Sequence, residues 1–322
     1  MSLYPLLLRP VLKNMLWGGT KLITQYGRKS ENPTVAESWE LCCHRDGMSV
    51  IENGELSGRT LAEITKMDKG LLGSACERFD RFPVLIKYID AADILSIQVH
   101  PGNEYALANE GDLGKTEMWY VQDCEPGAFL YYGFNREISR DEFAARIQNN
   151  TLPEVLNRVF VKPGDTLLVE AGTLHAIGKG ILIAEIQQNS NSTYRVYDFG
   201  RLDAAGNPRE LHAQKALDVT VLKPPVRKPG AIGKRESFAG FDRTLLSGCD
   251  WFTVYELCVH GECPLCADGV SFHSLLCLDG GLELRYDIKS LSLCAGSSVF
   301  VPANLGDYTL SGTGKALLTL EK

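Results

Sequence analysis

The chain has 322 residues, 44% of them hydrophobic and 23% charged, which is the composition of a globular protein large enough to bury a core without cross-links. Its net charge of -7 and the lack of a Lys/Arg-rich run exclude an ordinary nucleic-acid binder, although a few cations inside a pocket could still hold one phosphate. The longest early apolar run, residues 6–8, ends at Arg9 and Pro10 and is too short for a membrane span or a signal peptide, so we expect a cytoplasmic protein.

Short strands separated by turns dominate the expected secondary structure. The sequence predicts strands at residues 84–89, 94–100, 118–122, 166–169 and 180–187. A capping box at Thr60 and Glu63 predicts a helix toward Met67, Ser139 precedes a predicted helix at 141–148, and residues 152–159 and 210–219 have helix-like apolar spacing. This arrangement favours a mainly β fold, a barrel or sandwich with a small helical insert, over alternating β-α-β units.

A segment rich in proline, glycine and cations, residues 223–235, lacks apolar periodicity and is predicted to be a linker. It separates a predicted catalytic domain with helical segments, residues 1–222, from a smaller β domain, residues 236–322.

Two copies of one motif lie on either side of this linker. The first runs from Gly164 to His175, and the second runs from Gly296 to Asp307, with Asp307 at the place of the histidine. Both resemble the second motif of the cupins, so we expect two cupin (jelly-roll) barrels. Because the histidine is present in the first copy alone, we expect a structural or lid-like role for the second barrel.

Ten cysteines are spread along the chain without the spacing of a disulfide framework. Cys263 and Cys266 form a CxxC near His260, but the second pair that a structural zinc site needs is missing. The cysteines are therefore interpreted as reduced, small apolar residues, and neither a zinc site nor a redox pair is assigned to Cys263 and Cys266.

Two segments gather polar side chains at alternate positions, which share a face in a β-strand. The first group is Ser96, Gln98 and His100. The second group, on the next strand, is Lys115, Glu117 and Trp119. Each pattern by itself is more typical of a solvent-exposed strand face than of a functional site.

A functional role for His175 is favoured because the chain has only six histidines, and two of them, His100 and His175, occupy similar strand-end positions. A lone histidine there would more often be structural. Together, Gln98, His100, Glu117 and His175 offer two nitrogen and two oxygen atoms, a set that suits Zn²⁺ better than Mn²⁺ or Fe²⁺ and leaves positions open for a catalytic site. We therefore predict one Zn²⁺ per chain.

Downstream, Glu185 and Gln187 share a strand face, residues 188–192 form a polar turn, and Arg195 follows. An arginine between Tyr194 and Val196 is usually packed or paired at the surface, but near a metal pocket it can hold an oxyanion.

In this order, these segments resemble the type I mannose-6-phosphate isomerases, and most of all their short bacterial branch. The matching pieces are residues 16–19 (Leu-Trp-Gly-Gly), 36–40 (Ala-Glu-Ser-Trp-Glu), 96–101 (Ser-Ile-Gln-Val-His-Pro), 114–117 (Gly-Lys-Thr-Glu), 171–176 (Ala-Gly-Thr-Leu-His-Ala) and 188–198, which includes Thr-Tyr-Arg-Val-Tyr-Asp. The resemblance runs from about residue 5 to residue 215, and more loosely to the end.

The resemblance implies an enzyme that interconverts mannose 6-phosphate and fructose 6-phosphate. It implies metal ligands at Gln98, His100, Glu117 and His175, phosphate contacts at Ser96 and Lys115, and a catalytic arginine at Arg195. Glu185 and Lys87 match positions considered for proton transfer, and Trp17 and Glu37 match positions near the pocket. The chain departs from the longer branch at residues 113–117 and 190–192, where that branch has His-Lys-Pro-Glu and Ser-Asp-Asn.

Such an isomerase moves a proton between C1 and C2 of the sugar and stabilises an enediolate, with Glu185 as the expected base and Lys87 as the competing candidate. Two alternatives are another metal cupin enzyme, such as an iron oxygenase, and a sugar-phosphate-binding module without catalysis. Lys115 and Arg195 favour a phosphate-bearing substrate. We expect a small sugar phosphate as partner, with no nucleic acid and no membrane, and the sequence does not indicate the oligomeric state.

Overall fold

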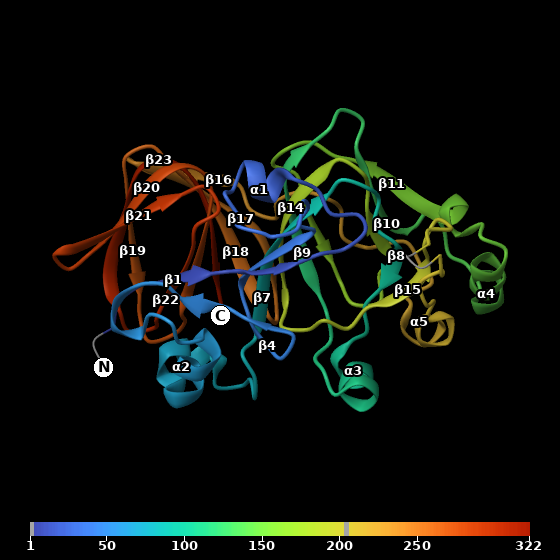
Figure 1. The fold of residues 1–322 in the computed structure, drawn as a ribbon, viewed down its shortest axis with the longest axis horizontal. Helices are drawn as coiled ribbons and strands as arrows, with labels where there is room; N and C mark the ends of the chain where they lie inside the picture. The colour runs from blue at the N-terminus through green and yellow to red at the C-terminus, as the bar shows by residue number, and fades with distance from the viewer. Residues whose placement is uncertain (1–2, 203–205) are drawn as a thin grey trace. The chain divides into compact units, whose positions relative to one another are not determined.

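A computed structural model describes residues 3–202 and 206–322, and its fold is mainly β, which confirms the predicted fold class (Figure 1). The chain divides into two compact units. The first contains the N-terminal segment up to Val11, Ser38–Lys87 and Gly230–Lys322, and the second contains Leu12–Glu37 and Tyr88–Pro229. The domain bounds 1–222 and 236–322, the linker 223–235 and the description as two barrels stay predictions.

The first unit contains most of the short N-terminal strands and all of the C-terminal ones. Its elements are β1 (Leu6–Arg9), β4 (Cys43–His44), β5 (Gly47–Met48), β6 (Val50–Ile51), α2 (Leu61–Met67), β16 (Arg235–Ser237), β17 (Phe241–Cys249), β18 (Phe252–Val259), β19 (Glu262–Ala267), β20 (His273–Tyr286), β21 (Lys289–Cys294), β22 (Ser298–Val301) and β23 (Gly306–Leu320), with 3-10 turns at Gly54–Leu56, Lys69–Leu72 and Ser74–Cys76.

The second unit contains the segments with candidate functional residues. Its elements are α1 (Lys21–Thr24), β8 (Ile97–Val99), α3 (Asn103–Glu110), β9 (Glu117–Cys124), β10 (Phe129–Phe134), α4 (Arg140–Gln148), a 3-10 turn at Leu152–Val155, β11 (Leu156–Phe160), β12 (Thr166–Val169), β13 (His175–Ile177), β14 (Ile181–Gln188), β15 (Tyr194–Tyr197) and α5 (Ala213–Val219). The chain passes from one unit to the other within β2 (Val11–Lys13), β3 (Glu37–Leu41) and β7 (Val84–Ala91).

A ten-stranded antiparallel sheet organises the first unit, in the order β16-β17-β18-β23-β20-β22-β1-β6, with β19 paired to β23 and β21 paired to β20. The two longest strands, β20 and β23, run side by side and are drawn in red in Figure 1. Leu275 lies opposite Leu318, and Leu284 lies opposite Leu310. These four side chains are fully or almost fully buried in one apolar cluster, so cross-strand packing stabilises the sheet.

Two sheets of the second unit enclose a core. One has the order β11-β10-β13-β8-β15, and the other contains β12, β9, β14 and β7 in that order. An apolar cluster draws Leu130 and Ile177 from the first sheet and Trp119, Leu167 and Ile183 from the second. The interior between the two sheets is therefore packed, as in a sandwich or a barrel.

Helices cover the opposite face of the five-stranded sheet. Phe143 of α4 and Ala216 of α5 pack with Ile97 and Val99 of β8, and α4 and α5 lie beside each other (Figure 1). Because neighbouring residues in a strand face opposite sides, Gln98 points away from these helices, into the space between the two sheets. Ile97 and Val99 thus form the apolar face of β8.

The two helix starts predicted from capping patterns are confirmed. Thr60 accepts a hydrogen bond from the backbone of Glu63, whose carboxylate accepts one from the backbone of Thr60, and α2 begins directly after Thr60. Ser139 caps α4 in the same way through the backbone N–H of Glu142.

Two helix predictions from apolar spacing need correction. Residues 152–159 form a single 3-10 turn and then strand β11, because an apolar spacing over eight residues also fits a half-buried strand. Residues 210–219 are helical from Ala213, and His212 precedes this helix without a side-chain cap. The strand predicted at 94–100 is shorter, since β8 contains Ile97–Val99.

The CxxC pair does not form a paired site. Cys263 is fully buried and Cys266 is exposed, because residues three apart in strand β19 point to opposite faces of the sheet.

His273 is a buried histidine of the first unit with a neutral partner. Its Nδ1 lies 2.8 Å from the hydroxyl of Tyr308, and burial lowers the pKa of His273 to about 4. The neutral form is therefore favoured in the folded state, whereas the unfolded chain binds a proton at the ordinary pKa of about 6.5. This histidine contributes stability that is complete above pH 6.5 and is lost as pH falls through the folded-state pKa.

We expect His273→Gln to remove part of the acid sensitivity of folding. Between pH 7.5 and pH 4.5, the wild type should lose about 2–3 kcal/mol more unfolding free energy than the variant, since each pKa unit is worth about 1.4 kcal/mol. Urea unfolding at both pH values measures this, with His260→Gln as a control because His260 is half exposed. An equal loss of unfolding free energy between the two pH values in the wild type and in His273→Gln would contradict the prediction.

Candidate metal centre

Three strand ends of the second unit bring a carboxylate and two imidazoles together. His100 follows β8 directly, Glu117 opens β9 and His175 opens β13. The ladders fix their places, since His175 lies opposite Gln98, and Glu117 lies opposite Val169 of β12. All three side chains are buried between the two sheets, so the polar strand faces found in the sequence are interior and not solvent-exposed.

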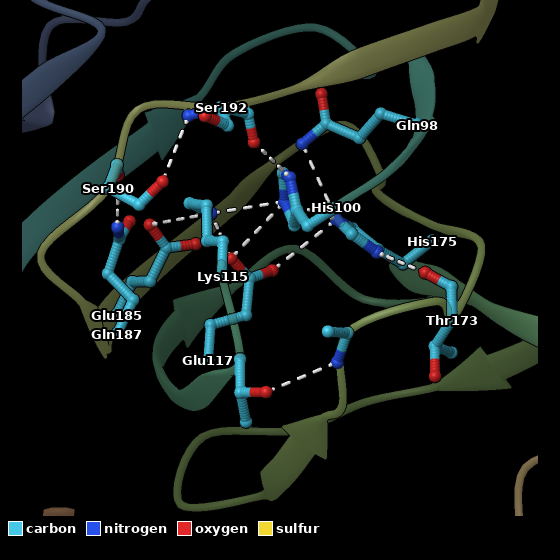
Figure 2. A network of polar contacts seen from close by, with 12 residues as sticks. Gln98, His100, Lys115, Glu117, Thr173, His175, Glu185, Gln187, Ser190 and Ser192 are labelled. Atoms are coloured by element: carbon cyan, nitrogen blue, oxygen red, sulfur yellow. Dashed lines mark hydrogen bonds and ion pairs between the residues drawn. The ribbon is translucent and has the colours of Figure 1, made fainter. Parts of the chain in front are cut away.

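The ligand atoms of these residues converge on one point. The two Nε2 atoms of His100 and His175 are 3.1 Å apart, and each lies 3.4 Å from a different oxygen of Glu117 (Figure 2). All three groups offer an atom within 4.8 Å of one another. This is a compact set of potential metal ligands.

Hydrogen bonds at the far side of each ring determine the tautomers. His100 Nδ1 lies 2.9 Å from the carbonyl oxygen of Ser192, and His175 Nδ1 lies 2.8 Å from that of Thr173. A carbonyl only accepts, so both Nδ1 atoms donate, and a neutral ring then has a lone pair on Nε2. Burial lowers the pKa of His100 to about 4 and also lowers that of His175, which keeps both rings neutral.

Two facing lone pairs cannot hydrogen-bond to each other, so a positive charge beside them is favourable. Glu117 adds a carboxylate whose Oε1 accepts no hydrogen bond among the described residues although it is fully buried. These features fit a divalent metal ion, whose histidine ligands are neutral and are oriented by a second hydrogen bond.

Lys115 lies inside the same cluster. Its ammonium donates to Glu117, lies 3.1 Å from His100 Nε2 and lies 3.8 Å from Glu185 (Figure 2). Burial would raise the pKa of Glu117, but the Lys115 ammonium opposes this, and the pKa lies well below its usual range. The carboxylate is therefore ionised, as a metal ligand must be.

Gln98 reaches the cluster from β8. Its side-chain amide lies 3.4 Å from His175 Nε2 and is partly buried. The oxygen and nitrogen of an amide exchange places by a simple flip, so this group is able to present its oxygen to the same point.

Arg195 lies on β15, opposite Gln98 in the ladder. Its Nε donates to Ser96 Oγ at 3.3 Å, and its Nη1 donates to the carbonyl of Glu210 at 2.9 Å. Burial, followed by repulsion from Arg209, lowers the pKa of Arg195. The structure thus pairs Ser96 with Arg195, while Lys115 contacts the potential metal ligands.

Glu185 lies on β14, opposite Trp119 of β9. Trp119 Nε1 donates to Glu185 Oε1 at 2.9 Å, and the Trp119 ring packs edge-on against His175 at 5.3 Å. One buried indole therefore orients Glu185 and supports a histidine of the cluster.

The remaining predicted residues are divided between the two units. Trp17 is buried in the apolar core of the second unit, and Glu37 opens β3. Lys87 is a buried residue of the first unit, with its ammonium 5.5 Å from the centre of the Trp39 ring. Roles for these three in substrate binding or proton transfer stay predictions.

Several polar residues around the cluster were missed by sequence reasoning. They are Asn103, Asp112, Thr116 and Thr173. Asp112 is buried and the other three are half-buried. Thr116 accepts a hydrogen bond from Ala171 through its side chain and donates one to Gln188 through its backbone. Asp112 contacts Asn191 and Thr116 contacts Ala171, far away in sequence, so a local pattern carries almost no signal for these two residues.

Comparison with known proteins identifies the family. Residues 6–125 match the catalytic domain of type I phosphomannose isomerase, and residues 242–320 match the cupin domain of mannose-6-phosphate isomerase. The putative mannose-6-phosphate isomerase YvyI of Bacillus subtilis (strain 168) is 39% identical, with 97% of this chain and 98% of the relative covered. This chain belongs to the type I mannose-6-phosphate isomerase family. The resemblance seen in the sequence is confirmed.

Other members agree along the full length. Mannose-6-phosphate isomerase ManA of Bacillus subtilis (strain 168) is 37% identical, with 99% of each chain covered. The crystal structure of a mannose 6-phosphate isomerase from Bacillus subtilis superposes with a TM-score of 0.92 at 37% identity, covering 98% of this chain and 99% of that one. A mannose 6-phosphate isomerase structure bound with zinc and yttrium has a TM-score of 0.78 at 20% identity, with 100% of each chain covered, and shows the fold alone.

Among the described residues, helices are too short and too polar to cross a membrane.

The Lys115–Glu117 pair gives a stability prediction. We expect Lys115→Met to lower the unfolding free energy by about 3–5 kcal/mol in chelator, because it leaves a buried carboxylate without its cation. The double variant Lys115→Met/Glu117→Gln should recover most of this loss. Urea unfolding of both variants tests it, and a double variant no more stable than Lys115→Met would count against the pair.

Proposed function

We propose that this chain interconverts mannose 6-phosphate and fructose 6-phosphate, using one bound Zn²⁺. The observation that carries the proposal is the buried pair of His100 and His175, whose Nε2 lone pairs face each other beside the Glu117 carboxylate. The family supports it, since ManA is named a mannose-6-phosphate isomerase. This activity is an aldose–ketose isomerisation.

His100, His175, Glu117 and Gln98 would hold the metal. Two imidazoles and two oxygen donors suit Zn²⁺, and open positions would remain for the substrate. When bound, the ion supplies Lewis-acid chemistry at the sugar oxygens, which favours loss of the neighbouring C–H proton.

Glu185 is the proposed base for proton transfer between C1 and C2. The Trp119 hydrogen bond fixes one carboxylate oxygen, and Lys115 lies 3.8 Å from the other. Glu117 is a poorer base because a metal ligand has a lowered affinity for protons. Lys87 is the second candidate. A positioned base typically contributes about 10²–10⁴-fold to the rate.

Arg195 would stabilise the enediolate that forms when the proton leaves carbon. Ser96 and the carbonyl of Glu210 hold its guanidinium, so the charge is oriented before reaction and need not reorganise. Ser96 and Lys115 are proposed to contact the phosphate. For Lys115 this requires its ammonium to turn from Glu117, because the two groups are in contact.

A second candidate function has one observation in its favour. Two histidines and one carboxylate are also the ligand set of many non-haem iron oxygenases. Metal analysis separates the candidates, because the isomerase is expected to retain zinc and the oxygenase iron. A sugar-phosphate-binding module without turnover is the third outcome.

The deciding experiment follows the conversion of mannose 6-phosphate to fructose 6-phosphate in native, chelated and zinc-restored protein. We expect chelation to abolish turnover and zinc to restore it, since His100, Glu117 and His175 converge on a single cation position. Magnesium added to the chelated protein serves as a control, because Mg²⁺ prefers oxygen ligands. Zinc-loaded protein without turnover would refute the proposed reaction.

Replacement of Arg195 should separate catalysis from metal binding. We expect Arg195→Ala to reduce kcat by about 10²–10³-fold, the usual cost of one oxyanion donor, while zinc content stays at one per chain. Arg158→Ala is the control, because Arg158 is a strand arginine of the same unit that packs over Phe129 and Tyr131 but is exposed. Wild-type kcat in Arg195→Ala would remove this residue from the mechanism.

A further inference from the structure

The loop between β14 and β15 supplies the acceptor that orients His100. Ser192 accepts the Nδ1–H of His100 through its backbone carbonyl, at 2.9 Å (Figure 2). A metal-binding histidine depends on such a partner, because it determines both the tautomer and the ring plane. The position of the Ser192 carbonyl is therefore as important as that of the imidazole.

Asp112 lies at the centre of the contacts that hold this loop. It follows Gly111, which ends α3 in the left-handed conformation with φ of 60°. Only 3% of Asp112 is exposed to solvent. Its Oδ2 accepts from the backbone N–H of Asn191 at 3.2 Å and lies 3.5 Å from the hydroxyls of Ser190 and Ser192. Its Oδ1 accepts from the backbone N–H of Leu113 at 2.9 Å.

One of the two serine hydroxyls near Asp112 donates a hydrogen bond to its carboxylate. A serine hydroxyl donates one hydrogen bond, and that of Ser190 goes to the carbonyl of Leu113 at 2.6 Å. The oxygen of Ser190 also accepts from the backbone N–H of Ser192 at 3.2 Å. The hydroxyl of Ser192 is therefore the side chain that donates to Asp112.

We propose that Asp112 is a positioning residue for the metal centre, acting on His100 through Ser192. The carboxylate binds Asn191 and Ser192 and thereby fixes the Ser192 carbonyl where the imidazole N–H meets it. This inference rests on the proposed metal-dependent function, and it adds a residue that does not touch the metal. Asp112 thus connects the loop after α3 to His100.

The chemistry of the position calls for a carboxylate. Leu113 N–H, Asn191 N–H and Ser192 O–H all donate to Asp112, and an ionised carboxylate accepts at both oxygens. An asparagine would turn its NH₂ group toward one of these donors. We therefore expect Asp112→Asn to hold the loop in part and to keep more of the zinc affinity than Asp112→Ala.

The experiment measures Zn²⁺ affinity by competition with a chromophoric chelator, without reference to turnover. Loss of a group that orients a metal-bound histidine typically weakens metal affinity by about 10–100-fold. We expect a weakening in this range for Asp112→Ala and a smaller one for Asp112→Asn. The zinc off-rate should rise in the same order.

Asp90→Asn is the matched control. Asp90 is a buried aspartate of the same unit that accepts a backbone hydrogen bond from Lys21 at 2.7 Å. We expect this variant to lower the melting temperature and leave zinc affinity within about twofold, since Asp90 contacts a different loop. Equal weakening in Asp90→Asn and Asp112→Ala would overturn the proposal, because the effect would then reflect general stability.

Ser192→Ala keeps the proposal testable if Asp112→Ala does not fold. It removes the hydroxyl that Asp112 binds and leaves the carbonyl, so a several-fold weaker zinc affinity is expected. Wild-type affinity in Ser192→Ala or in folded Asp112→Ala would refute the role of Asp112. Failure of the proposed reaction is distinguishable, since the wild type would then bind zinc without converting mannose 6-phosphate.

Discussion

Two neutral imidazoles that face each other through lone pairs are the constraint on which this site depends. The 3.1 Å separation of the His100 and His175 Nε2 atoms is favourable only with a cation beside them, because neither nitrogen has a proton to share. Both rings are held this way by backbone carbonyls on their far sides, at Ser192 and Thr173. The local folding of two loops therefore determines the electronic state of the ligands.

The β topology provides the rigidity that such an arrangement requires. The loop before His175 is tied to the first ligand, since the N–H of Gly172 donates to the carbonyl of His100 at 2.8 Å. Gly172 has φ of 88°, a conformation that favours glycine, and this allows the close turn. Thr116 joins the same loop to Gln188 on β14. The site is thus preorganised by contacts between strand ends that are distant in sequence.

Sequence alternation predicted which side chains share a face, but it could not predict where that face points. Lys115, Glu117 and Trp119 all contact the cluster, as their spacing implied, although a solvated face was the more ordinary interpretation. The 152–159 segment was misjudged because short apolar spacings fit both helix and strand. Asp112 left no signal at all, because its partner Ser192 lies 80 residues away in the chain and no local rule connects them.

Buried histidines in the two units differ in their hydrogen bonds. This difference makes His100 and His175 candidates for function and His273 a structural residue. His273, in the first unit, meets the hydroxyl of Tyr308, which is able to donate to its ring nitrogen, so the contact is complete within the protein. His100 and His175 instead donate to carbonyls and present acceptor nitrogens to an ionised Glu117, with the Lys115 ammonium 3.1 Å from that of His100. Desolvation lowers the pKa of all three histidines, so burial does not distinguish them. What distinguishes His100 and His175 is that Nδ1 donates to a backbone carbonyl. Nε2 then has a lone pair and is able to act as a metal ligand.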